Sequence, residues 1–191
     1  MKSVSIVFIS FMIFFCGCKS LKPVSEKEPE LTKPRVSIPD AEPTTINFSE
    51  QSTWLLGYFN INQLIMEPHS SWFIKGYNSY VPDNVAITRL KEISKENLEI
   101  KIVLGTWCPD SRREVPRFMK ILDIWQFPKD KVTFIGVDNA KLSPIGDYVN
   151  LEIERVPTFI FYKENYDVGR IIENPTTSLE QDMVNILSRN E

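Results

Sequence analysis

Cysteine and histidine are scarce in this 191-residue chain, which has three cysteines and one histidine. Cys16 and Cys18 stand near the N-terminus, far in sequence from Cys108, so a scaffold held by several disulfides is not expected. No cluster of cysteine and histidine accompanies His69, and neither a metal nor another cofactor is therefore predicted. We expect His69 to be a surface or turn residue beside Pro68.

An excess of one charge and a membrane-spanning run are also missing. The chain has 22 basic and 25 acidic residues, and its net charge of −3 gives no general electrostatic reason to expect binding to nucleic acid. The apolar run at residues 4–15 is shorter than the roughly 20 residues that a membrane-spanning helix needs. The 42% of hydrophobic residues suffice for one substantial core, and we expect one globular domain with tails.

The N-terminus indicates export. A positive charge, the apolar run and the small residue Gly17 before Cys18 describe an export signal over residues 1–17. The end of this signal resembles the box of bacterial lipoproteins, in which the cysteine is diacylated and becomes the mature N-terminus, although the two residues before Gly17 depart from that box. The resemblance implies lipidation at Cys18 and a lipid-anchored protein of the bacterial cell envelope that faces the periplasm or extracytoplasmic space. An ordinary cleaved signal with incidental cysteines is the alternative.

Two further segments precede the main domain. Residues 18–46 carry five prolines among alternating acids and bases, which predicts a disordered, extended tether. Residues 47–82 are rich in aromatics, and we expect a helical extension that packs on the main sheet; an aromatic groove that binds a partner is the alternative. We expect Ser70-Ser71 to cap a short helix that carries Trp72 and Gly76 or Tyr77 on one face.

Strand and helix patterns alternate over residues 83–191. The predicted strands are 98–105, 131–137, 158–162 and 168–172. The predicted helices begin after the N-cap Asp83, at about Asp110, at about Pro144 and at Leu179. Pro116 lies inside the second of these helices and should kink it. The order predicts an α/β fold in which a mixed sheet has helices on both faces.

A cysteine motif, Trp107-Cys108-Pro109-Asp110-Ser111, lies where the first of these strands meets a helix. Unpaired N–H groups and the helix dipole favour a thiolate at such a position, and only the thiolate attacks a disulfide. Arg112 and Arg113 can add to this effect, and Asp110 opposes it if its carboxylate points at the sulfur, so the sequence leaves the direction of the net effect open. The alternative for Cys108 is a small buried hydrophobe, and that for Ser111 is a hydroxyl that satisfies the first helical turn.

Residues 83–189 resemble the thioredoxin superfamily, and the chain as a whole resembles the membrane-tethered thioredoxin-like lipoproteins of bacteria. Trp107 directly precedes Cys108, and Pro116 follows eight residues later. Val156-Pro157-Thr158 resembles the cis-proline segment that faces the reactive sulfur and pairs with the substrate backbone. The resemblance implies a thioredoxin-like sheet flanked by helices, an exposed and reactive Cys108, a cis peptide before Pro157, and a site that also includes Trp107 and Ser111.

Two positions depart from the thioredoxin pattern. Ser111 replaces the resolving cysteine, and Ile102 stands where thioredoxins often keep a buried acid. The resemblance therefore implies a monothiol oxidoreductase or isomerase that acts on exported protein thiols or disulfides through Cys108, with an external thiol to complete the exchange. A client-trapping protein and a non-catalytic binding or scaffold module are alternatives. A small-ligand or metal carrier is disfavoured by the few histidines and cysteines.

Overall fold

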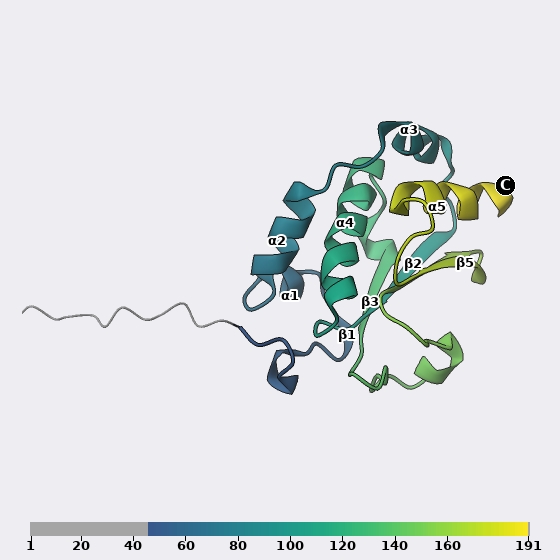
Figure 1. Cartoon of the computed structure of the whole chain (residues 1–191). Helices are drawn as coiled ribbons and strands as arrows, with labels where there is room; N and C mark the ends of the chain where they lie inside the picture. The colour runs from purple at the N-terminus through teal and green to yellow at the C-terminus, as the bar shows by residue number, and fades with distance from the viewer. Residues whose placement is uncertain (1–45, 191) are drawn as a thin grey trace, which may run out of the picture. The chain divides into compact units, whose positions relative to one another are not determined.

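The computed structural model describes residues 46–190, so the predicted signal, nearly all of the predicted tether and Cys18 lie outside the described residues. Five strands form one mixed sheet in the order β1-β3-β2-β4-β5 (Figure 1). The strands are β1 (Gly57–Phe59), β2 (Leu98–Leu104), β3 (Val132–Gly136), β4 (Thr158–Lys163) and β5 (Tyr166–Ile172). The α-helices are α1 (Asn62–Ile65), α2 (Ser70–Ser79), α3 (Asn84–Glu92), α4 (Pro109–Trp125) and α5 (Leu179–Leu187). Single 3-10 turns cover Gln51–Thr53, Lys129–Lys131, Tyr148–Leu151 and Ser188–Asn190.

The sheet is parallel at one pair of strands and antiparallel at the other three. β2 runs parallel to β3, whereas β1 with β3, β2 with β4, and β4 with β5 are antiparallel. Ile102 in the central strand β2 is paired with Phe134 on one side and Phe159 on the other. The predicted mixed sheet flanked by helices is therefore confirmed.

The two faces of the sheet are covered differently. Ile102 and its neighbours two residues away on β2 share a core cluster with residues of α3, α4 and α5. Val103 points to the opposite face, where it shares a second cluster with Tyr148 and Leu151 of a 3-10 turn. The helix predicted at about residues 144–149 on this face is corrected to the 3-10 helix Tyr148–Leu151, whereas the other face carries α-helices. Proline and glycine at 144 and 146 disfavour a helix there, and only the short turn forms.

The extension at residues 47–82 is only partly helical, which corrects the sequence prediction. Its strand β1 pairs with β3 at one edge of the sheet, so this segment belongs to the same compact unit as the rest of the described chain. Its helix α2 packs on α4, where a Cβ added to Gly76 would lie 2.6 Å from Cγ of Pro116. Helix α4 continues through Pro116 without a break.

The N-terminal caps of two helices show where local sequence decides structure and where it does not. Asp83 caps α3 as predicted, since its side chain accepts a 2.7 Å hydrogen bond from the backbone N–H of Ala86. The prediction for α2 was wrong, because its N-cap is His69 and not a serine. His69 lies in a turn but is buried, with 2% of its surface exposed. Its ring stacks on Phe48 and meets the edge of Trp72, each at 5.9 Å between centroids.

Candidate functional site

Cys108 lies at the junction of β2 and α4. It is the N-cap of α4, with φ −77° and ψ 124°, and the next residue, Pro109, occupies the first turn, where a missing N–H has no cost. The backbone N–H of Cys108 donates to the carbonyl of Gly105 at 2.9 Å, and its carbonyl accepts from the N–H of Arg112 at 3.1 Å. The cysteine backbone is thus held by both the turn and the helix, while its side chain makes no capping bond.

The thiol of Cys108 faces the segment before β4. Its Sγ donates to the carbonyl oxygen of Val156 at 3.3 Å. The peptide bond between Val156 and Pro157 is cis, as the sequence resemblance implied. The prediction that Cys108 is exposed was wrong, since only 6% of its surface is accessible. Tyr148 and Leu151 belong to the same buried cluster, which explains why a residue at the surface end of a helix is covered.

Ser111, a predicted site residue, has a structural role. It is fully buried, and its Oγ accepts a 3.3 Å hydrogen bond from the backbone N–H of Gly105. The hydroxyl therefore ties the first turn of α4 to the end of β2. This arrangement matches the structural alternative for Ser111, although its partner lies in the preceding loop and not in the helix.

Trp107 is fixed on two sides. Its indole Nε1 donates to the carbonyl of Val137 at 3.0 Å, and its ring lies 6.3 Å from that of Trp54. The ring also covers Gly105, where an added Cβ would come within 2.5 Å of indole atoms. Glycine at position 105 is therefore a condition for this placement of Trp107.

Arg112 is the cation directed at the cysteine loop. Its Nη1 donates to the carbonyls of Thr106 and Trp107, at 3.2 and 3.1 Å. Burial lowers the pKa of the Arg112 guanidinium, while the negative charge of a Cys108 thiolate acts in the opposite direction.

The other two charges in the first turn of α4 interact with each other. Nη2 of Arg113 lies 2.7 Å from Oδ1 of Asp110, and its Nε lies 2.6 Å from Oε1 of the buried Glu114. The Asp110 carboxylate is thus partly neutralised by Arg113. Of the two arginines that the sequence offered as support for a thiolate, Arg113 is paired with carboxylates, whereas Arg112 contacts the cysteine loop.

A segment that the sequence did not connect with the motif lies beside it. We call residues 48–55 the N-terminal strap. The hydroxyl of Thr106 donates to the carbonyl of Thr53 and accepts from the N–H of Leu55, both at 3.2 Å. The ring of Phe48 lies 4.8 Å from the Arg112 guanidinium carbon. The aromatic composition of the strap was the available signal, but it did not identify the partner.

The described part of the chain shows neither a metal-ligand cluster nor a span. Among residues 46–190, no group of three or more histidine, cysteine, aspartate or glutamate side chains is placed to hold a metal ion. Within the same residues, no helix combines the length and the apolar character needed to cross a bilayer.

Comparisons with known proteins leave the chain without a family. No family model matches the sequence, and no curated protein matches it. Among solved structures, the chain is similar to a protein of unknown function from Pseudomonas aeruginosa, with 13% sequence identity and a TM-score of 0.45. That match covers 64% of this chain and 84% of the other. A likeness at this level adds nothing to the description of the site.

Proposed function

We propose that this chain is a thioredoxin-like protein, tethered to a membrane through Cys18, that performs monothiol exchange with exported proteins through Cys108. The observation that carries the proposal is the position of the Cys108 thiol. It lies at the N-terminal end of α4 and faces, at 3.3 Å, the carbonyl that precedes the cis peptide bond to Pro157. On this proposal, the start of α4 holds the nucleophile. The backbone segment at Val156 and Pro157, which faces the sulfur, pairs with the substrate chain.

The exchange takes place in two steps that leave no unbalanced electrons. The Cys108 thiolate attacks one sulfur of a substrate disulfide, a new S–S bond forms, and the other substrate sulfur leaves as a thiolate. A second thiol, from the substrate itself or from a small molecule, then attacks the substrate sulfur of the mixed disulfide and releases the Cys108 thiolate. In the first case the substrate recovers a disulfide, and the result is an isomerisation when the attacking thiol belongs to a different cysteine of the substrate. In the second case the small thiol stays bonded to the substrate sulfur, and a second small thiol attacks that bond to release the reduced substrate and a small-molecule disulfide. Ser111 takes no part, because a hydroxyl cannot form a disulfide.

Two features of the loop bear on the first step. The thiol loses its hydrogen bond to the Val156 carbonyl when it ionises, which opposes reaction. We propose that the positive charge of Arg112, which is held against the carbonyls of Thr106 and Trp107 in the same loop, favours the resulting negative charge. A substrate must also reach a sulfur of which little is exposed, so we propose that binding shifts the segment around Tyr148 and Leu151, which shares the buried cluster with Cys108.

The proposal is tested by trapping. Cells that express the full chain are quenched with an alkylating agent, and adducts are separated on non-reducing gels. We expect adducts of the wild-type chain that disappear on reduction and are missing for Cys108→Ala. Ser111→Cys is the matched variant, since it supplies an internal second thiol and should shorten the life of each adduct. Adducts that persist in Cys108→Ala, or none from a wild-type chain shown to be folded, would refute thiol exchange.

The membrane tether is tested separately. Mass spectrometry of the mature N-terminus should find a diacylated Cys18, and Cys18→Ala should release the protein into the soluble fraction of the envelope. An unmodified N-terminus at another position would refute the anchor without touching the chemistry of Cys108.

Burial of the thiol favours a second candidate function, a binding module of the same fold without covalent chemistry. Cys108 has 6% of its surface exposed, and its thiol donates a hydrogen bond to the carbonyl of Val156. It is therefore placed much as a small core residue would be. On this alternative, Cys108→Ser leaves the set of co-purifying partners unchanged. Thiol exchange instead requires that the partners be lost with the cysteine.

A further inference from the structure

A cavity lies along α4, remote from the cysteine. It has a volume of about 400 Å³, and α1, α2, α4 and β3 contribute to its lining. Met119, at its floor, is ten residues beyond Pro109, or roughly 15 Å along the helix axis. Cavities of a few hundred Å³ with apolar walls and a few polar groups are typical of small-molecule sites.

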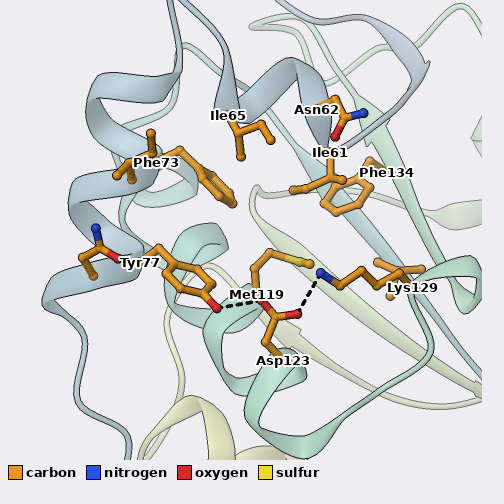
Figure 2. Close-up of a pocket in the computed structure, with 12 residues that line it drawn as sticks. Ile61, Asn62, Ile65, Phe73, Tyr77, Met119, Asp123, Lys129 and Phe134 are labelled. Carbon is orange, nitrogen blue, oxygen red and sulfur yellow. Dashed lines mark hydrogen bonds and ion pairs between the residues drawn. The ribbon is translucent and has the colours of Figure 1, made fainter.

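The walls of this cavity are apolar and come from separate elements. Figure 2 shows Ile65 of α1, Phe73 of α2, Met119 of α4 and Phe134 of β3 around one hollow. Ile65 is 45% exposed at the rim, whereas Phe73 and Phe134 are buried. An apolar body can therefore enter past Ile65 and leave water for a surface of aromatic and aliphatic side chains.

One end of the cavity is polar and carries a fixed carboxylate. The hydroxyl of Tyr77 donates to Oδ2 of Asp123 at 2.7 Å, and Oδ1 of Asp123 lies 3.2 Å from Nζ of Lys129 (Figure 2). Burial and the Asp123 carboxylate raise the pKa of Tyr77 to about 12, so its hydroxyl keeps its proton and remains the donor. Asp123 is thereby oriented from one side only.

The ammonium group at the other side is loosely held. The Lys129 side chain is 74% exposed, compared with 32% for Asp123, and exposed ion pairs of this kind contribute little to stability. Lys120, the preceding lysine in the sequence, donates instead to the carbonyls of Tyr80 and Asn78. The Asp123 carboxylate in the cavity is thus paired with an ammonium group, that of Lys129, which can be displaced at little energetic cost.

We propose that this cavity binds a small organic ammonium ion with an apolar aromatic or aliphatic body, its charged group replacing Lys129 at Oδ1 of Asp123. The apolar body takes the place of water between Phe73, Met119 and Phe134. The position of Nζ in Lys129 already marks where an ammonium fits. A carboxylate ligand is disfavoured, because it would meet the fixed negative charge of Asp123.

Three matched probes test the charge of the ligand. Binding to the full chain is measured by calorimetry with 4-phenylbutylamine, 4-phenylbutan-1-ol and 4-phenylbutanoate. We expect the amine to bind at least fivefold more tightly than the alcohol, and the carboxylate to bind most weakly. Tighter binding of the carboxylate, or no binding of the amine at millimolar concentration, would overturn the proposal.

Variants of the same cavity test its location. Asp123→Asn keeps an acceptor for Tyr77, and we expect it to weaken the amine fivefold or more while leaving the alcohol unchanged. Lys129→Ala should strengthen the amine about two- to fivefold, because the internal competitor is gone. Lys131→Ala removes a lysine from the same 3-10 turn that pairs instead with Glu99, and it should change nothing.

A steric variant completes the design. Ile65→Trp fills the entrance at an exposed position, so the fold is retained and all three probes should lose affinity. Binding of the amine that survives Ile65→Trp and Asp123→Asn, in variants whose thermal unfolding matches the wild type, contradicts a site in this cavity.

Discussion

Ser111 illustrates how one atom changes what a loop can do. A cysteine in its place would offer a second sulfur near Cys108, whereas the hydroxyl accepts a hydrogen bond from the N–H of Gly105 in a fully buried position. The N–H of Gly105 has no access to water there, so its satisfaction depends on this oxygen. The serine side chain thus lacks the sulfur needed for disulfide exchange, and it supplies the oxygen that accepts the hydrogen bond from Gly105.

This role predicts the effect of Ser111→Ala. The variant leaves a buried donor unpaired, and we expect its free energy of unfolding to fall by about 1–3 kcal/mol, measured by urea denaturation. Ser188→Ala, at an exposed position, is the control and should stay within about 0.5 kcal/mol of the wild type. Equal stabilities of the two variants would show that the hydroxyl is dispensable.

At the scale of elements, the contact of α2 with α4 places the aromatic extension on the domain. Gly76 and Pro116 lie at this contact, and a Cβ on Gly76 would stand 2.6 Å from a ring carbon that the α4 backbone holds in place. Glycine costs a helix up to about 1 kcal/mol relative to alanine. The close approach of two helices explains why the chain carries that cost here.

Gly76→Ala should therefore destabilise the protein although alanine is the better helix former. We expect a loss of about 1–2 kcal/mol, because overpacking outweighs the gain in propensity. Lys75→Ala, one residue earlier and exposed, is the control and should be neutral. In a Pro116→Ala background the 2.6 Å contact is lost and a contact of 3.2 Å with Cβ of residue 116 remains, so Gly76→Ala should cost less there than in the wild type. An unchanged cost in the double variant would place its origin elsewhere.

The elements differ in how far the sequence predicted them. The strands β2 to β5 and the cap Asp83 were predictable, because alternation and capping are local properties. The cis peptide at Pro157 followed only from the resemblance. Burial of Cys108 and of His69 was not predictable, because the residues that cover them, such as Tyr148 and Phe48, come from distant parts of the chain.

For the molecule as a whole, buried His69 couples pH to stability. Burial is the main cause that lowers its pKa, with a further contribution from the positive charge of Arg112 and an opposing one from Glu67. The unfolded chain therefore binds a proton at this residue more readily than the folded chain does. The contribution of His69 to stability is fully present above the pKa of the unfolded chain, about 6.5, and it is lost as the pH falls below that value.

Urea denaturation between about pH 6.5 and about pH 5 tests this coupling. We expect the free energy of unfolding to decrease with acidification by at most about 1.4 kcal/mol per pH unit from this residue. His69→Phe keeps a ring between Phe48 and Trp72 but cannot be protonated, and its stability should change less over the same interval. Identical slopes would assign the acid sensitivity to other groups.

The proposed thiol exchange requires that the fold makes Cys108 a nucleophile. The most direct measurement is the rate at which Cys108 of the full chain forms a mixed disulfide with a small disulfide at pH 7, followed by peptide mapping, before and after unfolding in urea. The account predicts a faster reaction in the folded chain, and an adduct that persists until a second thiol is added. A folded chain that reacts more slowly than the unfolded one would contradict the account, because burial would then protect Cys108 instead of activating it.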